Sequence, residues 1–183
     1  MVVVLVVVVA VVVVLALLVR VFNRLVKQRN KVADAWAGID VQLTRRHDLV
    51  PNLVEVVKGY KLHEQETLEA VTAQRTAARN PRNAAATGEV EEKVGNAVGS
   101  LLAVAEAYPD LKANTNFQDL QTQLATLEED LSFARRYYNG TVRNYNTSQQ
   151  TFPVVVFAAA LGFRPVEYFQ ADLDAKAAPS ARM

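Results

Sequence analysis

Residues 32–57 read VADAWAGIDVQLTRRHDLVPNLVEVV, and the spacing of the apolar residues in this segment predicts the fold. Its apolar residues recur at steps of three, four or seven, namely Val32, Trp36, Ile39, Leu43, Val50, Leu53 and Val57. This spacing is typical of a helix in a bundle. Arg46 falls on the same seam, between Leu43 and Val50. Proline usually ends or opens a helix. The apolar phase continues across Pro51 without a slip, however, so we predict a kink or at most a very tight break there.

The same periodicity extends in the C-terminal direction. The first helix is predicted to continue through Val71 and to end near Pro81, and residues 80–88 are predicted to form a loop because they combine proline, asparagine and glycine. A second helix is predicted from the apolar positions Val90, Val94, Val98, Leu101 and Ala105, and Pro109 marks its end.

A third helix is the longest of the unambiguous ones. Thr115 and Gln118 have the spacing of a capping box, and the apolar positions that follow are Phe117, Leu120, Leu124, Leu127, Leu131, Ala134, Tyr138, Val142 and Tyr145. The helix is predicted to end near Phe152. Residues 154–161 are too short to span a bilayer, so we expect them to close the bundle end, with membrane contact as the alternative. Residues 171–183 are predicted to be a disordered tail.

The predicted fold is therefore all-α. Residues 32–170 are predicted to form an antiparallel, up-and-down helical bundle with three long helices plus a short one.

The N-terminal residues 1–19 form an unbroken apolar run that is rich in valine. As a helix this run spans roughly 28 Å, close to the thickness of the bilayer core. A cleaved signal peptide would need a basic start and a small-residue cleavage site, and neither precedes Arg20. We expect residues 1–19 to be a retained transmembrane anchor that contacts the lipid bilayer.

A basic juxtamembrane segment, residues 20–31, follows the run. Its five cations have no acidic neighbour before Asp34 and are Arg20, Arg24, Lys27, Arg29 and Lys31. The positive-inside rule places the N-terminus outside and the rest of the chain in the cytoplasm. The same side chains are candidate contacts for anionic lipid headgroups, although an ordinary solvated helix face remains the alternative.

The overall charge and composition exclude several classes of partner. The chain has 20 Lys and Arg and 19 Asp and Glu, so without the five basic juxtamembrane residues 15 cations face 19 anions. The remaining domain is acidic, which argues against binding to nucleic acid. Cysteine is absent, so neither disulfides nor thiol chemistry is available, which fits a reducing compartment.

The sequence contains no convincing catalytic or metal-ligating set. His63-Glu64 resembles the start of a zinc-protease motif, but position 67 is threonine instead of the second histidine. Glu91-Glu92 and Glu128-Glu129-Asp130 are adjacent acids, which diverge around a helix and are predicted to be solvated. We therefore predict no catalytic residues, no metal and no cofactor.

Two polar clusters are candidate strips for binding a protein partner. The first strip consists of Arg45, Arg46, Asp48, Asn52 and Glu55, and the second of Arg135, Arg136 and Asn139. The simpler interpretation of the first is a charged helix flank, with Arg46 paired to a carboxylate inside the bundle to fix the register. For the second strip, a solvated helix face is the simpler interpretation.

Several long strings resemble the LemA family, covering the chain from about residue 22 to residue 169. They include Arg45-Arg46-His47-Asp48-Leu49-Val50-Pro51-Asn52-Leu53-Val54, Ala107-Tyr108-Pro109-Asp110-Leu111-Lys112-Ala113-Asn114 and Ala134-Arg135-Arg136-Tyr137-Tyr138-Asn139. The resemblance implies a bacterial plasma-membrane protein with one span, an outside N-terminus and a cytoplasmic helical bundle. It implies no established catalytic activity, and therefore no catalytic residues.

Three functional hypotheses follow. The leading one is a non-enzymatic, membrane-anchored scaffold or adaptor that docks an unidentified protein, such as another membrane protein. The alternative is a sensor of the membrane surface or of envelope stress that contacts anionic lipid. The third is a hydrolase that uses His47 and His63. The sequence leaves self-association open.

Overall fold

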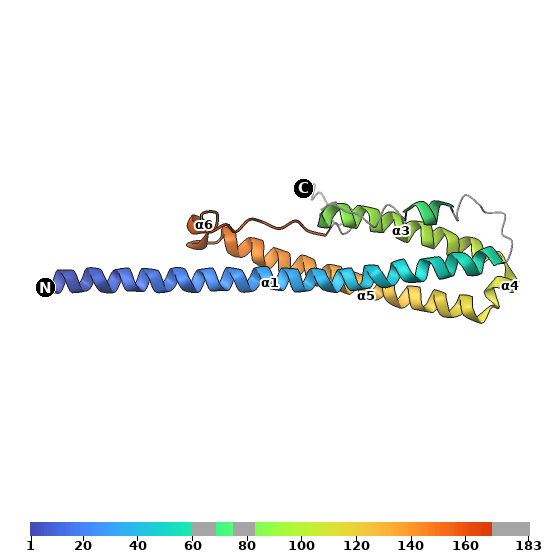
Figure 1. The fold of residues 1–183 in the computed structure, drawn as a ribbon, viewed down its shortest axis with the longest axis horizontal. Coiled ribbons are helices and arrows are strands. Elements are labelled where there is room, and N and C mark those ends of the chain that lie inside the picture. Colours follow the sequence, from blue (N-terminus) through green and yellow to red (C-terminus); the bar gives the residue numbers. More distant parts are fainter. Residues whose placement is uncertain (60–68, 75–82, 170–183) are drawn as a thin grey trace, which may run out of the picture. The chain divides into compact units, whose positions relative to one another are not determined.

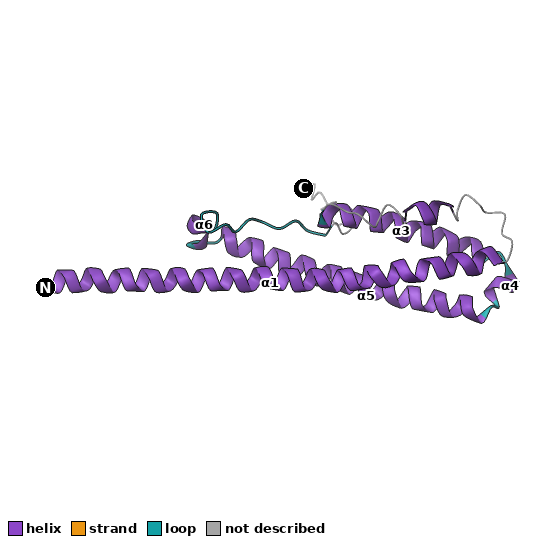
Figure 2. Cartoon of the chain, viewed as in Figure 1, coloured by secondary structure: helices purple, strands orange, loops and turns teal. Residues whose placement is uncertain are grey.

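The computed structural model describes residues 1–59, 69–74 and 83–169, and within these ranges the chain is almost entirely helical (Figure 2). The helices are α1 (Val2–Gly59), α3 (Ala84–Ala105), α4 (Pro109–Lys112), α5 (Thr115–Gln150) and α6 (Val154–Phe157). Residues 69–74 are helical as well, and the described part of the chain contains no strand. The prediction of an all-α fold with a long apolar N-terminal helix is confirmed.

The chain divides into two compact units. The first unit consists of Met1–Trp36 and Tyr137–Val166, and the second of Ala37–Arg136 and Glu167–Met183. Helices α1 and α5 each contribute to both units.

In the first unit, α1 begins with the apolar run. An 18-residue window of this helix has a mean hydropathy of 3.8 and none of it is buried, so α1 is long and apolar enough to cross a membrane. Burial starts at Leu25 and continues at Val32 and Ala35. The C-terminal part of α5 packs there, with Tyr138, Val142 and Tyr145 buried, and the Trp36 and Tyr138 rings meet edge to face with centroids 5.4 Å apart.

The chain after α5 is fastened to the same unit. The peptide bond between Phe152 and Pro153 is cis, and α6 follows as a single turn. Gly162 has a φ of +80°, a conformation that glycine adopts without steric cost. Asn146 then donates to the carbonyl of Val166 (2.8 Å) and accepts from its N–H (2.9 Å). Of residues 154–161, Val154–Phe157 form α6 and the remainder form turns.

In the second unit, the C-terminal part of α1 packs with α3 and the first half of α5. Figure 1 shows these parts of α1 and α3 running in the same direction and α5 running in the opposite one. The core contains the residues predicted from the apolar periodicity, including Val50, Leu53 and Val57 from α1 and Val94, Val98 and Leu101 from α3. Phe117, Leu120 and Leu124 of α5 complete it.

Helix α1 continues through Pro51. The continuous apolar phase across the proline therefore indicated the structure correctly, and no break occurs there. Residues 69–74 are helical and Val71 lies in the core, whereas the other residues over which the first helix was predicted to continue, 60–68 and 75–81, lie outside the described residues.

Two predicted helix starts are wrong in detail. Residues 84–88 belong to α3 and not to a loop, because alanine has the highest helix propensity and the Asn83 side chain caps the helix by accepting from the Ala86 N–H (2.8 Å). Helix α5 is capped by Asn114, whose Oδ1 accepts from the Phe117 N–H (3.1 Å), and not by Thr115. The predicted tail, residues 171–183, lies outside the described residues.

Candidate functional site

A buried ion network joins the three helices of the second unit. Arg46 of α1 is only 1% exposed, and its Nη1 donates to the Glu91 carbonyl (3.1 Å) and to Glu91 Oε2 (3.3 Å) of α3. Arg46 Nη2 lies 2.6 Å from Glu128 Oε1 of α5. The prediction that Arg46 pairs with a carboxylate inside the bundle is confirmed.

Glu91 is the acidic centre of this network. It is 1% exposed, and its second oxygen, Oε1, lies 2.9 Å from His47 Nε2. The prediction that the acids at positions 91 and 128 are solvated is therefore wrong for Glu91, which needs Arg46 because an unpaired buried carboxylate would be strongly unfavourable. Glu128 keeps 45% of its side chain exposed although it pairs with Arg46.

Gly95 of α3 leaves the space that the Arg46 guanidinium occupies. A Cβ atom at this position would lie 2.7 Å from Arg46 Nη2, closer than real Cβ contacts allow. Neither Gly95 nor Glu91 stands out in the sequence, since a glycine and an acid within a helix have no pattern of their own.

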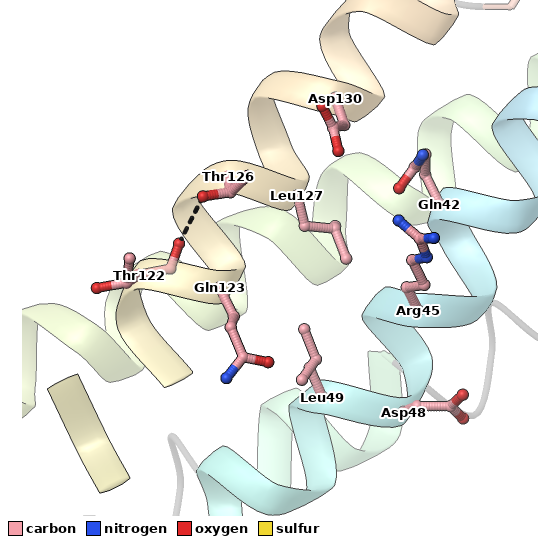
Figure 3. A pocket seen from close by; sticks show the side chains of 9 residues that line it. All are labelled: Gln42, Arg45, Asp48, Leu49, Thr122, Gln123, Thr126, Leu127 and Asp130. Atoms are coloured by element: carbon pink, nitrogen blue, oxygen red, sulfur yellow. Dashed lines mark hydrogen bonds between the residues drawn. The ribbon is translucent and has the colours of Figure 1, made fainter. Parts of the chain in front are cut away.

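An open groove of about 410 Å³ lies beside the network, between α1 and α5 of the second unit. Figure 3 shows Leu49 and Leu127 pointing toward one another across it, so the floor is apolar. Polar side chains surround the floor, and they are Gln42, Arg45 and Asp48 from α1 and Thr122, Gln123, Thr126 and Asp130 from α5. The groove can therefore accept an elongated ligand with an apolar ridge and polar edges.

The rim of the groove carries both signs of charge. Arg45 extends toward Gln42, whereas Asp48 points away from α5 (Figure 3). Gln42 Oε1 is buried and has no hydrogen-bond partner among the described residues. An unpaired buried acceptor is uncommon in proteins, and a donor from a ligand would satisfy it.

The structure separates the members of the first predicted strip. Arg45 and Asp48 line the groove, whereas Asn52 and Glu55 are exposed outside its lining. Arg46 is buried and therefore cannot contact a partner in this conformation. Sequence reasoning missed the four polar residues of α5 that line the groove, because they look like any solvated helix face.

The members of the second predicted strip lie on α5 and differ in exposure. Arg135 is partly buried with its guanidinium over the Phe169 ring (5.0 Å), and Arg136 covers the exposed Phe133 ring (4.6 Å). Asn139 is partly buried in the first unit. Cation–π contacts therefore account for the two arginines within the fold.

The five basic juxtamembrane residues, Arg20, Arg24, Lys27, Arg29 and Lys31, are all exposed. Arg29 also lies over the Phe163 ring, 5.8 Å from its centroid. Burial raises the pKa of the neighbouring Tyr145 above its ordinary value, and the positive charge of Arg29 partly lowers it again. The other four remain available to anionic headgroups.

In the described ranges, no group of three or more His, Cys, Asp or Glu side chains could hold a metal ion. His47 contacts Glu91 of the buried network, with 2.9 Å between Nε2 and Oε1. The second residue of the hydrolase hypothesis, His63, lies outside the described residues.

Comparison with known proteins gives a family. The model of the LemA family matches residues 35–182. Protein LemA of Metamycoplasma hominis is 27% identical over 150 residues, which cover 81% of this chain and 68% of that protein. Magnetosome protein MamQ 2 of Paramagnetospirillum magneticum is 23% identical over 181 residues, which cover 85% of this chain and 66% of that protein.

A shorter match involves magnetosome protein MamQ of Magnetospirillum gryphiswaldense, 32% identical over 75 residues, or 41% of this chain and 28% of that protein. The chain spans about two thirds of the length of the first two relatives. Since α1 is long and apolar enough to cross a membrane, the family match identifies a membrane-associated protein. The chain belongs to the LemA family.

Proposed function

We propose that the protein is a non-enzymatic, membrane-anchored scaffold that docks a protein partner at the bacterial plasma membrane. The observation that carries this proposal is the groove between α1 and α5, lined by Arg45 and Asp48 on one side and by Thr126 and Asp130 on the other. The names of the relatives denote no enzymatic activity, which is consistent with this role.

The chemistry of the groove indicates the kind of partner. Leu49 and Leu127 supply an apolar floor, and amphipathic helices dock in grooves of this kind through apolar residues three or four positions apart. Arg45 on the rim favours an acidic flank on the partner, and the acceptor at Gln42 favours a polar donor. The buried network holds the groove walls in place, since Arg46 ties α1 to α5 through Glu128.

Site-specific photo-crosslinking in intact cells tests the proposal. A photoreactive amino acid at Gln123, on the groove rim, should form a discrete crosslink to one protein. The same probe at Ala125, exposed on the same helix but outside the groove lining, is the matched control. The charge reversal Arg45→Glu should weaken the Gln123 crosslink. Equal crosslinking at both positions, or none at either, would contradict the proposal.

We propose further that the N-terminus lies outside the cell and the bundle in the cytoplasm, as the five cations after the apolar run favour. The absence of cysteine makes a direct test possible. An Ala125→Cys variant in intact cells should react with a membrane-impermeant maleimide only after lysis. Labelling before lysis would place the bundle on the outer side of the membrane.

A second candidate function, sensing of the membrane surface or of envelope stress, is favoured by the exposure of Arg20, Arg24, Lys27 and Lys31 directly after the span. Each such cation contributes about 1 kcal/mol of attraction to an anionic surface. In nanodiscs, an effect of anionic lipid on the proteolysis of the bundle that disappears at high salt would support this function. Identical proteolysis in neutral and anionic lipid would exclude it.

A further inference from the structure

Residues 152–161 expose an unusual amount of apolar surface. Five large side chains in this segment are exposed, and they are Phe152 (80%), Val155 (50%), Val156 (61%), Phe157 (37%) and Leu161 (40%). The sequence from residue 144 to residue 163 contains no Asp, Glu, Lys or Arg. Contiguous apolar patches of this kind on a protein surface mark a contact with a partner or a membrane.

The segment is held in a defined place by its ends. At one end it continues directly from α5, and at the other the Phe163 ring is buried and meets the Phe22 ring of α1 edge to face, with centroids 5.5 Å apart. The Phe163 N–H also donates to the Ala158 carbonyl (3.0 Å), which closes the turn. Beyond it, Asn146 fixes Val166 through two hydrogen bonds.

This placement sets the level of the segment along α1. Leu18, Val19 and Phe22 of α1 line a hollow of about 300 Å³ together with Phe157, Ala160 and Leu161. Leu18 and Val19 are the last residues of the apolar run, and Arg20 follows them. The exposed residues of the segment therefore lie next to the end of the membrane-crossing stretch.

The bilayer is the occupant that this position favours. The apolar run of α1 is fully exposed within its own unit, so lipid must surround it, and the segment's apolar surface continues the same lipid-facing surface. Phe152 and Phe157 have the bulky apolar character of interfacial anchors, and no charged residue in the segment opposes insertion.

We propose that residues 152–161 form a second, non-spanning membrane-contact element that inserts beside the end of the α1 span. Segments of this type lie about 5–10 Å into the boundary between headgroups and acyl chains. The chain then touches the bilayer at two points, which are separated in sequence by residues 20–151. A helix with one point of attachment can rotate about its axis, whereas a second point restricts this rotation.

Fluorescence quenching in proteoliposomes tests the proposal on the full chain. Single-cysteine variants Val156→Cys, Thr147→Cys and Val9→Cys carry an environment-sensitive dye. Position 147 is exposed on α5 in the same unit and serves as the aqueous control, and position 9 lies within the apolar run. Brominated lipid should quench the dye at position 156 about threefold more than at position 147, because bromine quenches over distances comparable with the insertion depth. Aqueous iodide should give the opposite order.

A charged variant tests the same element without relying on one label. With the dye at Leu161→Cys, the pair Val155→Glu and Val156→Glu should reduce quenching by brominated lipid about threefold, because carboxylates at an apolar membrane boundary are unfavourable. The pair Thr147→Glu and Gln150→Glu adds the same charge at exposed positions of α5 and should leave the quenching unchanged.

Two results would overturn the proposal. The first is a dye at position 156 that responds to iodide and brominated lipid as the dye at position 147 does. The second is protection at position 156 that disappears when the protein is diluted tenfold into more lipid, since this result would assign the surface to contact with a second copy of the chain.

Discussion

Removal of the Arg46 side chain should be among the most destabilising single changes in the protein. Arg46→Met leaves Glu91 with His47 as its remaining partner in the network, while Glu91 itself stays 1% exposed. Breaking a buried ion pair by removing one partner costs about 3–5 kcal/mol. Methionine fills a similar volume without charge, so we expect a loss of about 3–5 kcal/mol in the free energy of unfolding, dominated by the buried Glu91 carboxylate that has lost its guanidinium partner.

A second substitution separates this cause from simple loss of packing. In the double variant Arg46→Met and Glu91→Met, no uncompensated buried charge remains, because Glu128 is 45% exposed and can be hydrated. Replacement of a whole buried pair by apolar residues is often neutral or stabilising. The double variant should therefore be within about 1.5 kcal/mol of the wild type, which requires a coupling energy of about 2 kcal/mol or more.

Urea unfolding of the full chain in detergent micelles, followed by circular dichroism at a helix-sensitive wavelength, measures all four members of this cycle. The denaturant dependence of the signal also reports whether the variants keep the same unfolding cooperativity. If the two substitutions are simply additive, the network does not work as argued, and Arg46 contributes through packing alone.

Three further predictions use the same unfolding assay. Gly95→Ala should be destabilising by about 1–2 kcal/mol, because its Cβ would displace the Arg46 guanidinium. Gly99→Ala, with nothing within 4 Å of its Cβ, should instead be stabilising by about 0.5–1 kcal/mol. Equal effects at the two glycines would contradict this reasoning. Asn83→Ala should lower the free energy of unfolding by about 1 kcal/mol through loss of the α3 cap. Asn96→Ala, in the exposed middle of α3, should be close to neutral. A neutral Asn83→Ala would rule out a stabilising cap. Because the pKa of Tyr145 is raised in the folded state, its stabilising contribution is complete below pH 10.0 and is lost as the pH rises through the folded-state pKa. Tyr145→Phe should therefore lose less stability than the wild type between neutral and strongly alkaline pH, and parallel pH profiles would refute the assignment.

Much of the fold could be predicted from the sequence because its dominant signal is periodic. Steps of three and four place Ile39, Leu53 and Leu131 in the core, and the structure buries all three completely. The same argument indicated that the helix continues past Pro51, because the apolar periodicity keeps its phase only when a helix continues. The apolar run before Arg20 was equally direct, because length and hydropathy are both properties of the sequence alone.

The candidate site was harder to predict, because its parts come from different helices. Arg46 was visible as a charge on an apolar seam, but Glu91 was indistinguishable from its exposed neighbour Glu92. Only the packing of α3 decides which of two adjacent acids turns inward. The groove has the same origin, since Thr122 and Thr126 acquire a role only through their position opposite α1.

The buried network also supplies what the apolar seam lacks, which is a unique register. In α5 the apolar residues repeat at intervals of seven, at Phe117, Leu124, Leu131, Tyr138 and Tyr145, so a shift of one heptad still sets apolar residues against an apolar seam. The same shift moves either Gln121 or Arg135 into the place of Glu128. A heptad shift of α3 replaces Glu91 by Ala84 or Val98, so Arg46 would be left buried without its carboxylate. Since that loss amounts to several kcal/mol, the charged residues select one register among several that the apolar residues alone would allow.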